Sequence, residues 1–446
     1  MPDLDAIFKA YDIRGVVPDE LDASVARLVG NAFVGFTGAD RVLVGKDMRP
    51  TSGPLATAFI DGATLAGADV VDLGMASTDL VYFASGALEA PAAMFTASHN
   101  PARYNGIKLC RAGAAPVGEE SGLAQIKETV AGGLIERAEA PGHVEHRDLL
   151  TDYAAHVRSF VDRGALRPLR VVADTANGMG GLVVPPVFDG LPFELTVLYA
   201  ELDGTFPNHP ADPIQPENLE DLAKAVLEAD ADVGLAFDGD ADRVFLVDER
   251  AEPLSGSLTT SIVAKGMLER HLNETVVYNL ICSKAVPEIV SEMGGAPVRS
   301  RVGHSFIKQV MADTGAIFGG EHSGHYYFRD NFRADSGLIA AVIVLEQLSR
   351  AGIPLSELRI PFERYAASGE INTRVVGPAA VLERVAGEYA SADQDRLDGL
   401  TVDFGDWWFN LRPSNTEPLL RLNLEASDRA TCDARTAEVL ALVRDE

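Results

Sequence analysis

Two hydrophobic patterns alternate along the first two-thirds of the chain. Over residues 21–36 apolar side chains recur every three or four positions, which predicts an amphipathic helix that Gly38 would end. At 42–44 they instead form a short unbroken run, which is typical of a buried strand. A helix-like stretch at 54–65 and a strand-like run at 70–73 follow. This alternation predicts a layered α/β unit.

The same alternation occurs twice more along the chain. The predicted elements of the second unit are helices at 152–161 and 217–227 and strands at 169–173, 233–237 and 244–247. Those of the third unit are helices at 257–268 and 286–293 and strands at 276–278 and 316–319. We therefore expect three related α/β modules with mixed sheets.

From about residue 362 the pattern changes. Strand-like runs occur at 370–376, 407–409 and 419–424, with helical patterns at 379–389 and 428–443. This order predicts a smaller C-terminal α+β domain. A charged, glycine-containing stretch at 132–147 marks the first boundary. We expect domains at 1–147, 148–251, 252–362 and 363–446.

Composition narrows the classes of function. A chain of 446 residues, 47% of them hydrophobic, can form several domain cores. Its formal net charge of −28 argues against a nucleic-acid-binding protein, because phosphate backbones are held by basic surfaces. An anionic substrate would need a local basic cluster on this acidic protein.

The cysteines and the apolar runs indicate a compartment. Cys110, Cys282 and Cys432 are far apart and form no C-x-x-C pair, so we expect free thiols in a reducing environment. No signal-peptide pattern and no run long enough to span a bilayer occur in the sequence. We expect a cytoplasmic protein that is not associated with a membrane.

A polar loop, TASHNP at 96–101, separates two apolar runs and presents the hydroxyl group of Ser98. Pro101 should stiffen the loop by fixing its own φ and restricting Asn100. Alone, this stretch is an ordinary turn. Three further polar loops change its interpretation, since each lies beside an apolar run: DGDADR at 238–243, GEHSGH at 320–325 and RPSNTEP at 412–418.

The second loop carries Asp238, Asp240 and Asp242. Carboxylates at alternate positions can converge on one hard cation such as Mg²⁺. An EF-hand is excluded because Arg243 replaces the required glycine and the flanking segments are strands. Aspartate-nucleophile phosphatases also place Asp-x-Asp after a strand, but normally near the N-terminus and without the third aspartate. Arg243 is placed to offset the carboxylate charge.

The third loop carries side chains that can hydrogen-bond to the adjacent hydroxyl groups of a sugar. They are Glu321, His322, Ser323 and His325. A glycine-rich histidine loop can equally be a metal site or a simple turn, and the loop alone does not decide between these.

The fourth loop combines a guanidinium, hydroxyl groups and an amide in a potential anion cradle. Its residues are Arg412, Ser414, Asn415 and Thr416. Further basic candidates for the anion cluster are Arg14, Lys284, Arg301 and His304. A turn without a ligand is the competing interpretation of the loop.

Two other classes of site are disfavoured. The glycine cluster at 178–181 does not complete G-x-G-x-x-G, because the third glycine would fall on Val183. We expect a tight strand-to-helix turn there. A Ser-His-Asp hydrolase is disfavoured because no G-x-S-x-G elbow surrounds Ser98.

In content and in order, the four loops resemble the signature loops of the α-D-phosphohexomutase family, most closely its phosphomannomutase/phosphoglucomutase branch. The resemblance runs nearly end to end and implies four domains around a central cleft. It implies that Ser98 carries a phosphate and that the three aspartates hold Mg²⁺, with the phosphate on Ser98 as a further metal ligand. It also implies sugar recognition by the Glu321 loop and phosphate binding by the Arg412 loop. Among titratable residues near Ser98, it favours Lys108 as the proton carrier and His99 as a supporting group.

The resulting hypothesis is an isomerase of carbohydrate metabolism, a Mg²⁺-dependent phosphoprotein. It would interconvert hexose 1-phosphate and hexose 6-phosphate through phosphoserine and a hexose 1,6-bisphosphate, with glucose 1,6-bisphosphate as activator. We expect small-molecule phosphosugars as partners and a monomer or weak homodimer.

The alternatives within the family are a phosphoglucosamine mutase and a glucose-only phosphoglucomutase. An alternative of another class is a catalytically silent sugar-phosphate-binding protein. It is disfavoured because the reactive groups are intact, from Ser98 and the aspartates to Arg243, Glu321 and Arg412. A hydrolytic phosphatase would differ by net release of inorganic phosphate.

Overall fold

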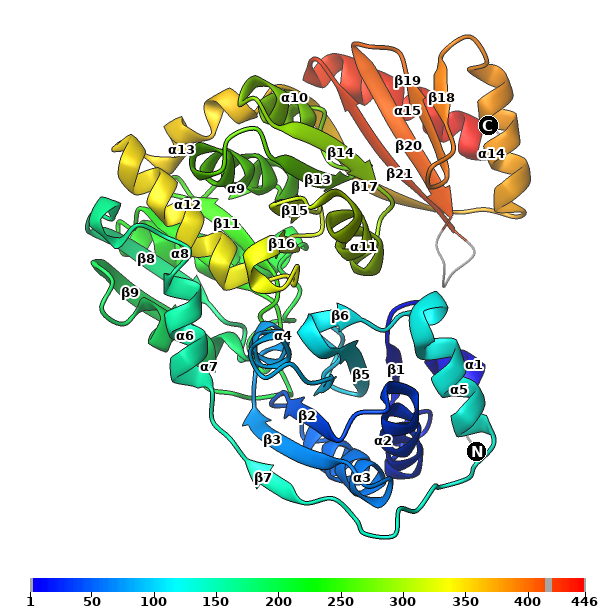
Figure 1. Ribbon diagram of the computed structural model, residues 1–446. Helices are drawn as coiled ribbons and strands as arrows, with labels where there is room; N and C mark the ends of the chain where they lie inside the picture. The colour runs from blue at the N-terminus through cyan, green and yellow to red at the C-terminus, as the bar shows by residue number, and fades with distance from the viewer. Residues whose placement is uncertain (1–2, 414–418, 445–446) are drawn as a thin grey trace.

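The computed structural model describes residues 3–413 and 419–444. Within this part, the strands form four sheets that follow one another along an arc (Figure 1). The N-terminal domain lies at the bottom of the view and the C-terminal domain at its upper right. Three α/β units followed by an α+β unit confirm the predicted fold class.

The first domain has a mixed sheet of order β1-β5-β4-β2-β3-β7, with β6 paired to β5. Its strands are β1 (Ile13–Val16), β2 (Arg41–Lys46), β3 (Asp69–Met75), β4 (Ala92–Phe95), β5 (Tyr104–Arg111), β6 (Ala115–Pro116) and β7 (Val144–His146). Its helices are α1 (Leu4–Ile7), α2 (Ala23–Thr37), α3 (Ser52–Leu65), α4 (Thr78–Ala87) and α5 (Ala124–Ala131). Strands β3, β2 and β4 are parallel neighbours, so the loops that follow them emerge at one edge of the sheet.

Helix α2 agrees with its predicted pattern at both ends. Asp22 caps its first turn by accepting a hydrogen bond from the backbone N–H of Val25. The helix ends at Gly38, whose φ of 62° is the left-handed conformation that glycine favours.

The second domain has a sheet of order β12-β11-β10-β8-β9, in which β8 is parallel to β9 and β10. Its strands are β8 (Leu169–Asp174), β9 (Phe193–Leu198), β10 (Val233–Phe237), β11 (Val244–Asp248) and β12 (Pro253–Leu254). Its helices are α6 (Leu150–Arg158), α7 (Gly180–Phe188) and α8 (Glu220–Glu228). The glycine cluster forms the turn into α7 and allows close backbone packing: a Cβ atom on Gly178 would lie 2.7 Å from the carbonyl oxygen of Gly239.

The third domain has a sheet of order β14-β13-β15-β16. Its strands are β13 (Thr275–Asn279), β14 (Ala296–Ser300), β15 (Phe318–Gly320) and β16 (Tyr326–Phe328). Its helices are α9 (Gly256–Arg270), α10 (Ala285–Glu292), α11 (His304–Thr314), α12 (Gly337–Ala351) and α13 (Leu355–Leu358). The prediction started β15 two residues early. It also missed α12, whose residues are buried almost all round and therefore lack an amphipathic pattern.

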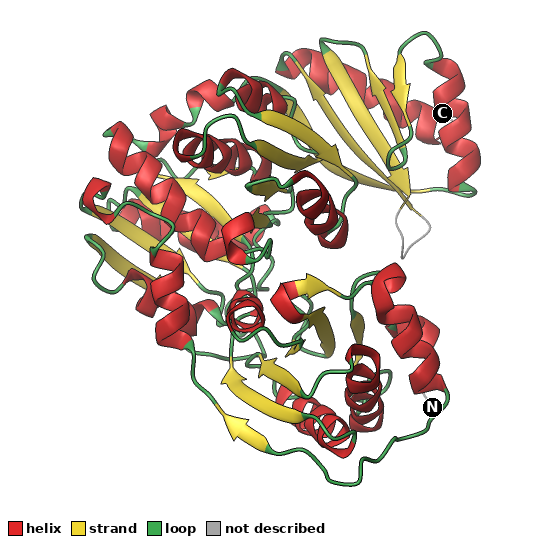
Figure 2. Ribbon diagram, in the orientation of Figure 1, coloured by secondary structure: helices red, strands yellow, loops and turns green. Residues whose placement is uncertain are grey.

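The C-terminal domain has an antiparallel sheet of order β17-β21-β20-β19-β18, against which α14 and α15 pack (Figure 2). Its strands are β17 (Ala366–Arg374), β18 (Asp393–Asp395), β19 (Leu400–Asp403), β20 (Trp407–Pro413) and β21 (Leu419–Ala426). Its helices are α14 (Pro378–Glu388) and α15 (Arg429–Arg444).

The buried core is shared unequally among the domains. One continuous apolar cluster, which includes Leu43 and Phe362, joins the first three domains. The C-terminal domain has a cluster of its own around Phe409.

The three cysteines, Cys110, Cys282 and Cys432, are free, as their spacing predicted, and all three are buried. In the described segments, no single helix has the length and apolar character needed to cross a membrane; α12 and the segment 355–362 would qualify only as a pair bent by 90°.

Candidate active site

The loop that carries Ser98 connects the antiparallel strands β4 and β5. Ser98 has a φ of 49°, a left-handed conformation that is uncommon for residues other than glycine. Its backbone N–H donates to the side-chain oxygen of Thr96 at 2.9 Å. The local backbone therefore presents the Ser98 hydroxyl in a fixed orientation.

The buried guanidinium group of Arg49 stabilises this loop by hydrogen bonds. It donates to the carbonyl oxygens of Ser98 at 2.8 Å, Asn100 at 2.6 Å, Pro101 at 2.9 Å and Tyr104 at 3.0 Å. The prediction missed Arg49, although a polar stretch after the predicted strand at 42–44 was a usable signal.

The Ser98 hydroxyl lies between a carboxylate and an imidazole. Its Oγ donates to Oδ2 of Asp238 at 2.6 Å and lies 3.2 Å from Nδ1 of His99. Burial, helped by the positive charges of Arg243 and Arg14, lowers the pKa of His99 well below its ordinary value. The His99 imidazole is therefore neutral near pH 7.

The three aspartates converge as the sequence predicted. Asp238, Asp240 and Asp242 are buried in the loop between β10 and β11, and each offers one oxygen within 4.8 Å of the others. Between them, a Cβ atom on Gly239 would lie 2.4 Å from the carbonyl oxygen of Ser98. The absence of a side chain there lets the aspartate loop reach the serine loop.

The aspartate cluster fits a divalent cation. Oδ1 of Asp240 and Oδ1 of Asp242 are buried and lack a hydrogen-bond partner among the residues that the structure describes. Burial, reinforced by the two neighbouring carboxylates, raises the pKa of Asp238 to about 7 despite the opposing charge of Arg243. Oxygen ligands with uncompensated negative charge are the donor set that Mg²⁺ prefers.

Two basic side chains partly balance this charge. Lys108, on β5, places its Nζ 2.7 Å from Oδ2 of both Asp240 and Asp242. Arg243 places Nη2 2.9 Å from Oδ2 of Asp238. Burial alone would lower the pKa of Lys108, but the two carboxylates outweigh it and raise that pKa well above its ordinary value. Lys108 therefore carries an ammonium group.

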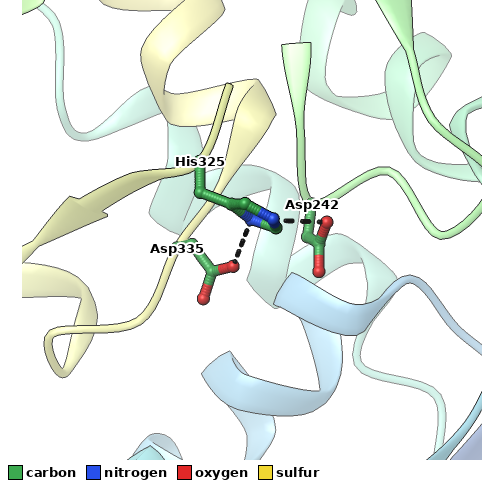
Figure 3. Close-up of side chains that lie close together, drawn as sticks. All are labelled: Asp242, His325 and Asp335. Atoms are coloured by element: carbon green, nitrogen blue, oxygen red, sulfur yellow. Dashed lines mark hydrogen bonds and ion pairs between the residues drawn. The ribbon is translucent and has the colours of Figure 1, made fainter. Parts of the chain in front are cut away.

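The third loop joins this cluster through His325 (Figure 3). Its Nδ1 lies 3.0 Å from Oδ2 of Asp335 and 3.8 Å from Oδ1 of Asp242. Asp335 is also 3.0 Å from Nζ of Lys308. The group Asp242, His325 and Asp335 could geometrically hold a cation. Because Lys308 and Lys108 already supply positive charge at its two ends, we assign it instead as a network of ion pairs with one hydrogen bond, between His325 and Asp335.

The other members of the third loop differ in burial. Glu321 is buried and accepts hydrogen bonds from the hydroxyl of Tyr327 and, at 3.1 Å, from the amide of Asn279. His322 contacts Ser257 at 3.0 Å through its Nδ1. Ser323 is partly exposed.

The predicted basic candidates lie in different places. Arg14 joins the serine loop, because its Nη1 donates to the side chain of Asn100 at 2.6 Å. His304 lies edge-on to the ring of Tyr11 at 5.0 Å, and burial with the nearby charge of Lys308 lowers its pKa to about 3.

Arg301 lies 4.3 Å over the ring of Phe306. The remaining two candidates, Lys284 and Arg412, form ion pairs with carboxylates. Nζ of Lys284 is 2.6 Å from Oδ1 of Asp403, which links the third and fourth domains. Nη2 of Arg412 is 3.1 Å from Oε2 of Glu370. Ser414, Asn415 and Thr416 lie outside the described residues.

Four family models match the chain. The phosphoglucomutase/phosphomannomutase alpha/beta/alpha domains I, II and III match residues 5–133, 151–252 and 255–365. The C-terminal domain of the same family matches residues 370–442.

Curated relatives and a solved structure extend the similarity over the whole length. The phosphohexose mutases of Xanthomonas campestris pv. campestris are 41% identical over 98% of this chain and 99% of theirs. The phosphomannomutase of Salmonella montevideo is 39% identical over 98% of both chains. The crystal structure of a phosphoglucomutase/phosphomannomutase family protein from Burkholderia thailandensis superposes with a TM-score of 0.90 at 31% identity, covering 100% of this chain and 98% of that one.

Proposed function

Because the chain belongs to the phosphoglucomutase/phosphomannomutase family, we propose that it interconverts hexose 1-phosphates and hexose 6-phosphates with Ser98 as the phosphoryl carrier. It is an isomerase of the phosphohexomutase type, as its relatives are. The proposal extends to the roles of individual residues, to the metal and to the sugars. It includes glucose 1,6-bisphosphate as activator and a monomer or weak homodimer.

The observation that carries the proposal is the contact between two domains at Ser98. Its Oγ is 2.6 Å from Oδ2 of Asp238, within the cluster of three buried carboxylates. A hydroxyl on a fixed backbone beside a potential metal site is the arrangement that phosphoryl transfer needs, because catalysis rests on positioning and on neutralising phosphate charge.

Different residues have different roles in the proposed reaction. Asp238, Asp240 and Asp242 would hold Mg²⁺, which when bound neutralises charge on the phosphoryl oxygens. The sugar hydroxyl attacks the phosphorus of phosphorylated Ser98, so one O–P bond forms as the Ser98 Oγ–P bond breaks. The proton of the sugar hydroxyl passes to the released Ser98 oxygen, giving a hexose 1,6-bisphosphate and the Ser98 hydroxyl. This intermediate reverses its orientation in the site. The Ser98 oxygen then attacks the other phosphorus, and the bond between that phosphorus and its sugar oxygen breaks.

Proton transfer and anion binding complete the proposal. The Lys108 ammonium donates a proton to the departing sugar oxygen in the step that restores phosphoserine, and the proton released by the Ser98 hydroxyl restores the ammonium. The neutral His99 orients the Ser98 hydroxyl. Sugar and phosphate binding are proposed for the remaining candidates, Arg14, Lys284, Arg301, His304, Glu321, Ser323, His325, Arg412, Ser414, Asn415 and Thr416.

The test is an isomerisation assay with mannose 1-phosphate, glucose 1-phosphate and glucosamine 1-phosphate, each with Mg²⁺ and a trace of glucose 1,6-bisphosphate. We expect comparable turnover of the mannose and glucose substrates. Turnover of glucosamine phosphate alone would point to a phosphoglucosamine mutase, and turnover of glucose phosphate alone to a phosphoglucomutase. No turnover would favour the silent binding protein.

The serine is tested by Ser98→Ala, which should abolish turnover and the incorporation of labelled phosphate from glucose 1,6-bisphosphate. The matched control is Ser159→Ala, since Ser159 is exposed and its hydroxyl bonds only a carbonyl of its own helical region. That variant should retain wild-type activity. Robust turnover by Ser98→Ala would contradict the mechanism.

A further inference from the structure

The first turn of α4 lies where the first domain meets the next two (Figure 1). Ser77 caps the helix, and Thr78 and Asp79 are its first two residues. All three side chains have no solvent exposure. The prediction assigned no role to this turn, which directly follows β3 at the sheet edge shared with the Ser98 loop.

Thr78 makes two hydrogen bonds to one residue of the aspartate cluster in the second domain. Its backbone N–H donates to the carbonyl oxygen of Asp240 at 3.1 Å. Its hydroxyl donates to Oδ2 of Asp240 at 2.5 Å. The helix N-terminus therefore faces the carboxylate with its positive end, which favours the ionised form.

The two carboxylate oxygens of Asp240 differ in their hydrogen-bond partners. Oδ2 accepts from the Thr78 hydroxyl and from Nζ of Lys108. Oδ1 is buried and has no hydrogen-bond partner in the described part of the chain, residues 3–413 and 419–444. Since donors occupy one oxygen, the other is left free to face a cation. The rotation of the carboxylate is fixed by Thr78 together with Lys108.

The turn itself is held rigidly by Asp79. Its carboxylate accepts hydrogen bonds from the hydroxyl of Tyr153, which lies on α6, and from Oγ of Ser336, which caps α12, the latter at 2.7 Å. The hydroxyl of Ser77 donates to the same carboxylate. Contacts from α6 and from the start of α12 hold the first turn of α4, so the Thr78 hydroxyl has a fixed position at the aspartate cluster.

We propose that Thr78 is a positioning residue for the metal site, whose hydroxyl orients Asp240 so that Oδ1 points at the cation. This rests on the proposed function, in which Asp240 is a metal ligand. Outer hydrogen bonds of this kind typically change metal affinity by about 10- to 100-fold when they are removed.

The experiment compares Thr78→Val, which keeps the shape of the side chain but removes the hydroxyl, with Thr78→Ser, which keeps the hydroxyl. Binding of Mn²⁺ to each protein is measured by the electron paramagnetic resonance signal of the free ion, without substrate. The Mg²⁺ concentration for half-maximal mutase activity is measured in parallel. The control is Thr57→Val, since the exposed Thr57 hydroxyl bonds only the carbonyl oxygen of Gly53 in its own helix.

We expect Thr78→Val to weaken Mn²⁺ binding and to raise the required Mg²⁺ concentration by about 10- to 100-fold. Thr78→Ser and Thr57→Val should remain within about threefold of wild type, a smaller change than that range. A purely structural role would lower the thermal stability of Thr78→Val but leave the metal affinity of the folded protein unchanged, and that outcome would overturn the inference. If the wild type itself neither binds Mn²⁺ nor turns over phosphosugars, the result contradicts the proposed function, and with it the inference about Thr78.

Discussion

Buried side chains that touch no substrate decide the geometry of this site. Arg49 is the clearest example, because its single guanidinium satisfies four carbonyl oxygens around Ser98. Its Nε also pairs with Oδ2 of Asp47 at 3.2 Å, and both side chains are fully buried. The planar, forked shape of arginine suits several acceptors at once, whereas lysine is a point charge.

The prediction at this scale is that Arg49→Lys misplaces Ser98. An ammonium group cannot reach all four carbonyl oxygens, and each buried acceptor left unpaired costs about 1–3 kcal/mol. We expect a loss of about 3 kcal/mol or more in the free energy of unfolding and at least a tenfold fall in kcat, about 1.4 kcal/mol in the barrier. Denaturation and steady-state assays measure the two effects.

The matched control for Arg49 is Arg250→Lys. Arg250 is 67% exposed and forms a surface ion pair with Glu249 at 3.5 Å. Exposed ion pairs of this kind contribute little to the free energy of unfolding, so the change in stability should stay within about 0.5 kcal/mol. Equal effects of the two substitutions would show that the hydrogen bonds of Arg49 are unimportant.

At the scale of elements, the site is built from loops brought together by the order of the strands. Strands β2, β3 and β4 are parallel neighbours, and the segments after them carry Arg49, Thr78 and Ser98. The loop between β10 and β11 then inserts its aspartates against this edge. That approach is possible because the loop has a glycine at its point of contact, Gly239.

Gly239→Ala should separate the two loops. Its Cβ would meet the carbonyl oxygen of Ser98 at 2.4 Å, and backbone atoms cannot move aside as a flexible side chain can. We expect a destabilisation of about 1–3 kcal/mol, which is typical of overpacking. We also expect a loss of mutase activity of about 100-fold, since misplacement by roughly 1 Å has effects of that size. Thermal unfolding and steady-state kinetics would measure them.

Gly35→Ala serves as the comparison. Gly35 lies in α2, and nothing lies within 4 Å of a Cβ atom built there. Alanine in a helix interior should raise stability by up to about 1 kcal/mol without affecting activity. Full activity of Gly239→Ala would mean that the two loops tolerate a wider separation than the structure has.

At the scale of the whole molecule, the first three domains share a continuous core and the fourth is joined by polar contacts. Lys284 carries three of these contacts. Its backbone N–H donates to Oε2 of Glu425 at 2.9 Å, and its Nζ pairs with Asp403 and donates to the carbonyl oxygen of Gly405 at 3.0 Å. Among the first three domains, Asp79 ties α4 to Tyr153 and Ser336. Ionisation of the Asp79 carboxyl group therefore affects the stability of the contacts among these three domains.

Asp79 should make stability depend on pH. Burial raises its pKa from the ordinary 3.8 to about 7, although the hydroxyl groups of Ser77, Tyr153 and Ser336 act in the opposite direction. Between these values the folded protein retains a proton that the unfolded chain has released. The stability that Asp79 contributes is complete below about pH 4 and is lost as the pH rises through about 7, by about 1.4 kcal/mol per pH unit.

Asp79→Asn removes this ionisation. Its stability relative to wild type should improve steadily from pH 5 to pH 7 and level off above, as followed by calorimetric melting at each pH. Asp152→Asn, on the exposed side of α6, is the control and should change the free energy of unfolding by less than about 1 kcal/mol. Parallel curves for wild type and Asp79→Asn would contradict the raised pKa.

The sequence by itself determined the class of fold and the positions of the polar loops. Local periodicity specifies helices and buried strands, as at α2 and β10, because a side chain's face follows from its spacing along the chain. Alternating aspartates between two apolar strands likewise predicted the convergence of Asp238, Asp240 and Asp242 that the structure displays.

Only the tertiary structure decided which distant side chains meet. Thr78 contacts Asp240 and Asp79 contacts Ser336, residues 162 and 257 positions away in the chain. It also paired Lys284 with Asp403 of the C-terminal domain. The physical reason is that a local pattern records burial and backbone preference, whereas pairings across domains depend on how the sheets and their loops pack together.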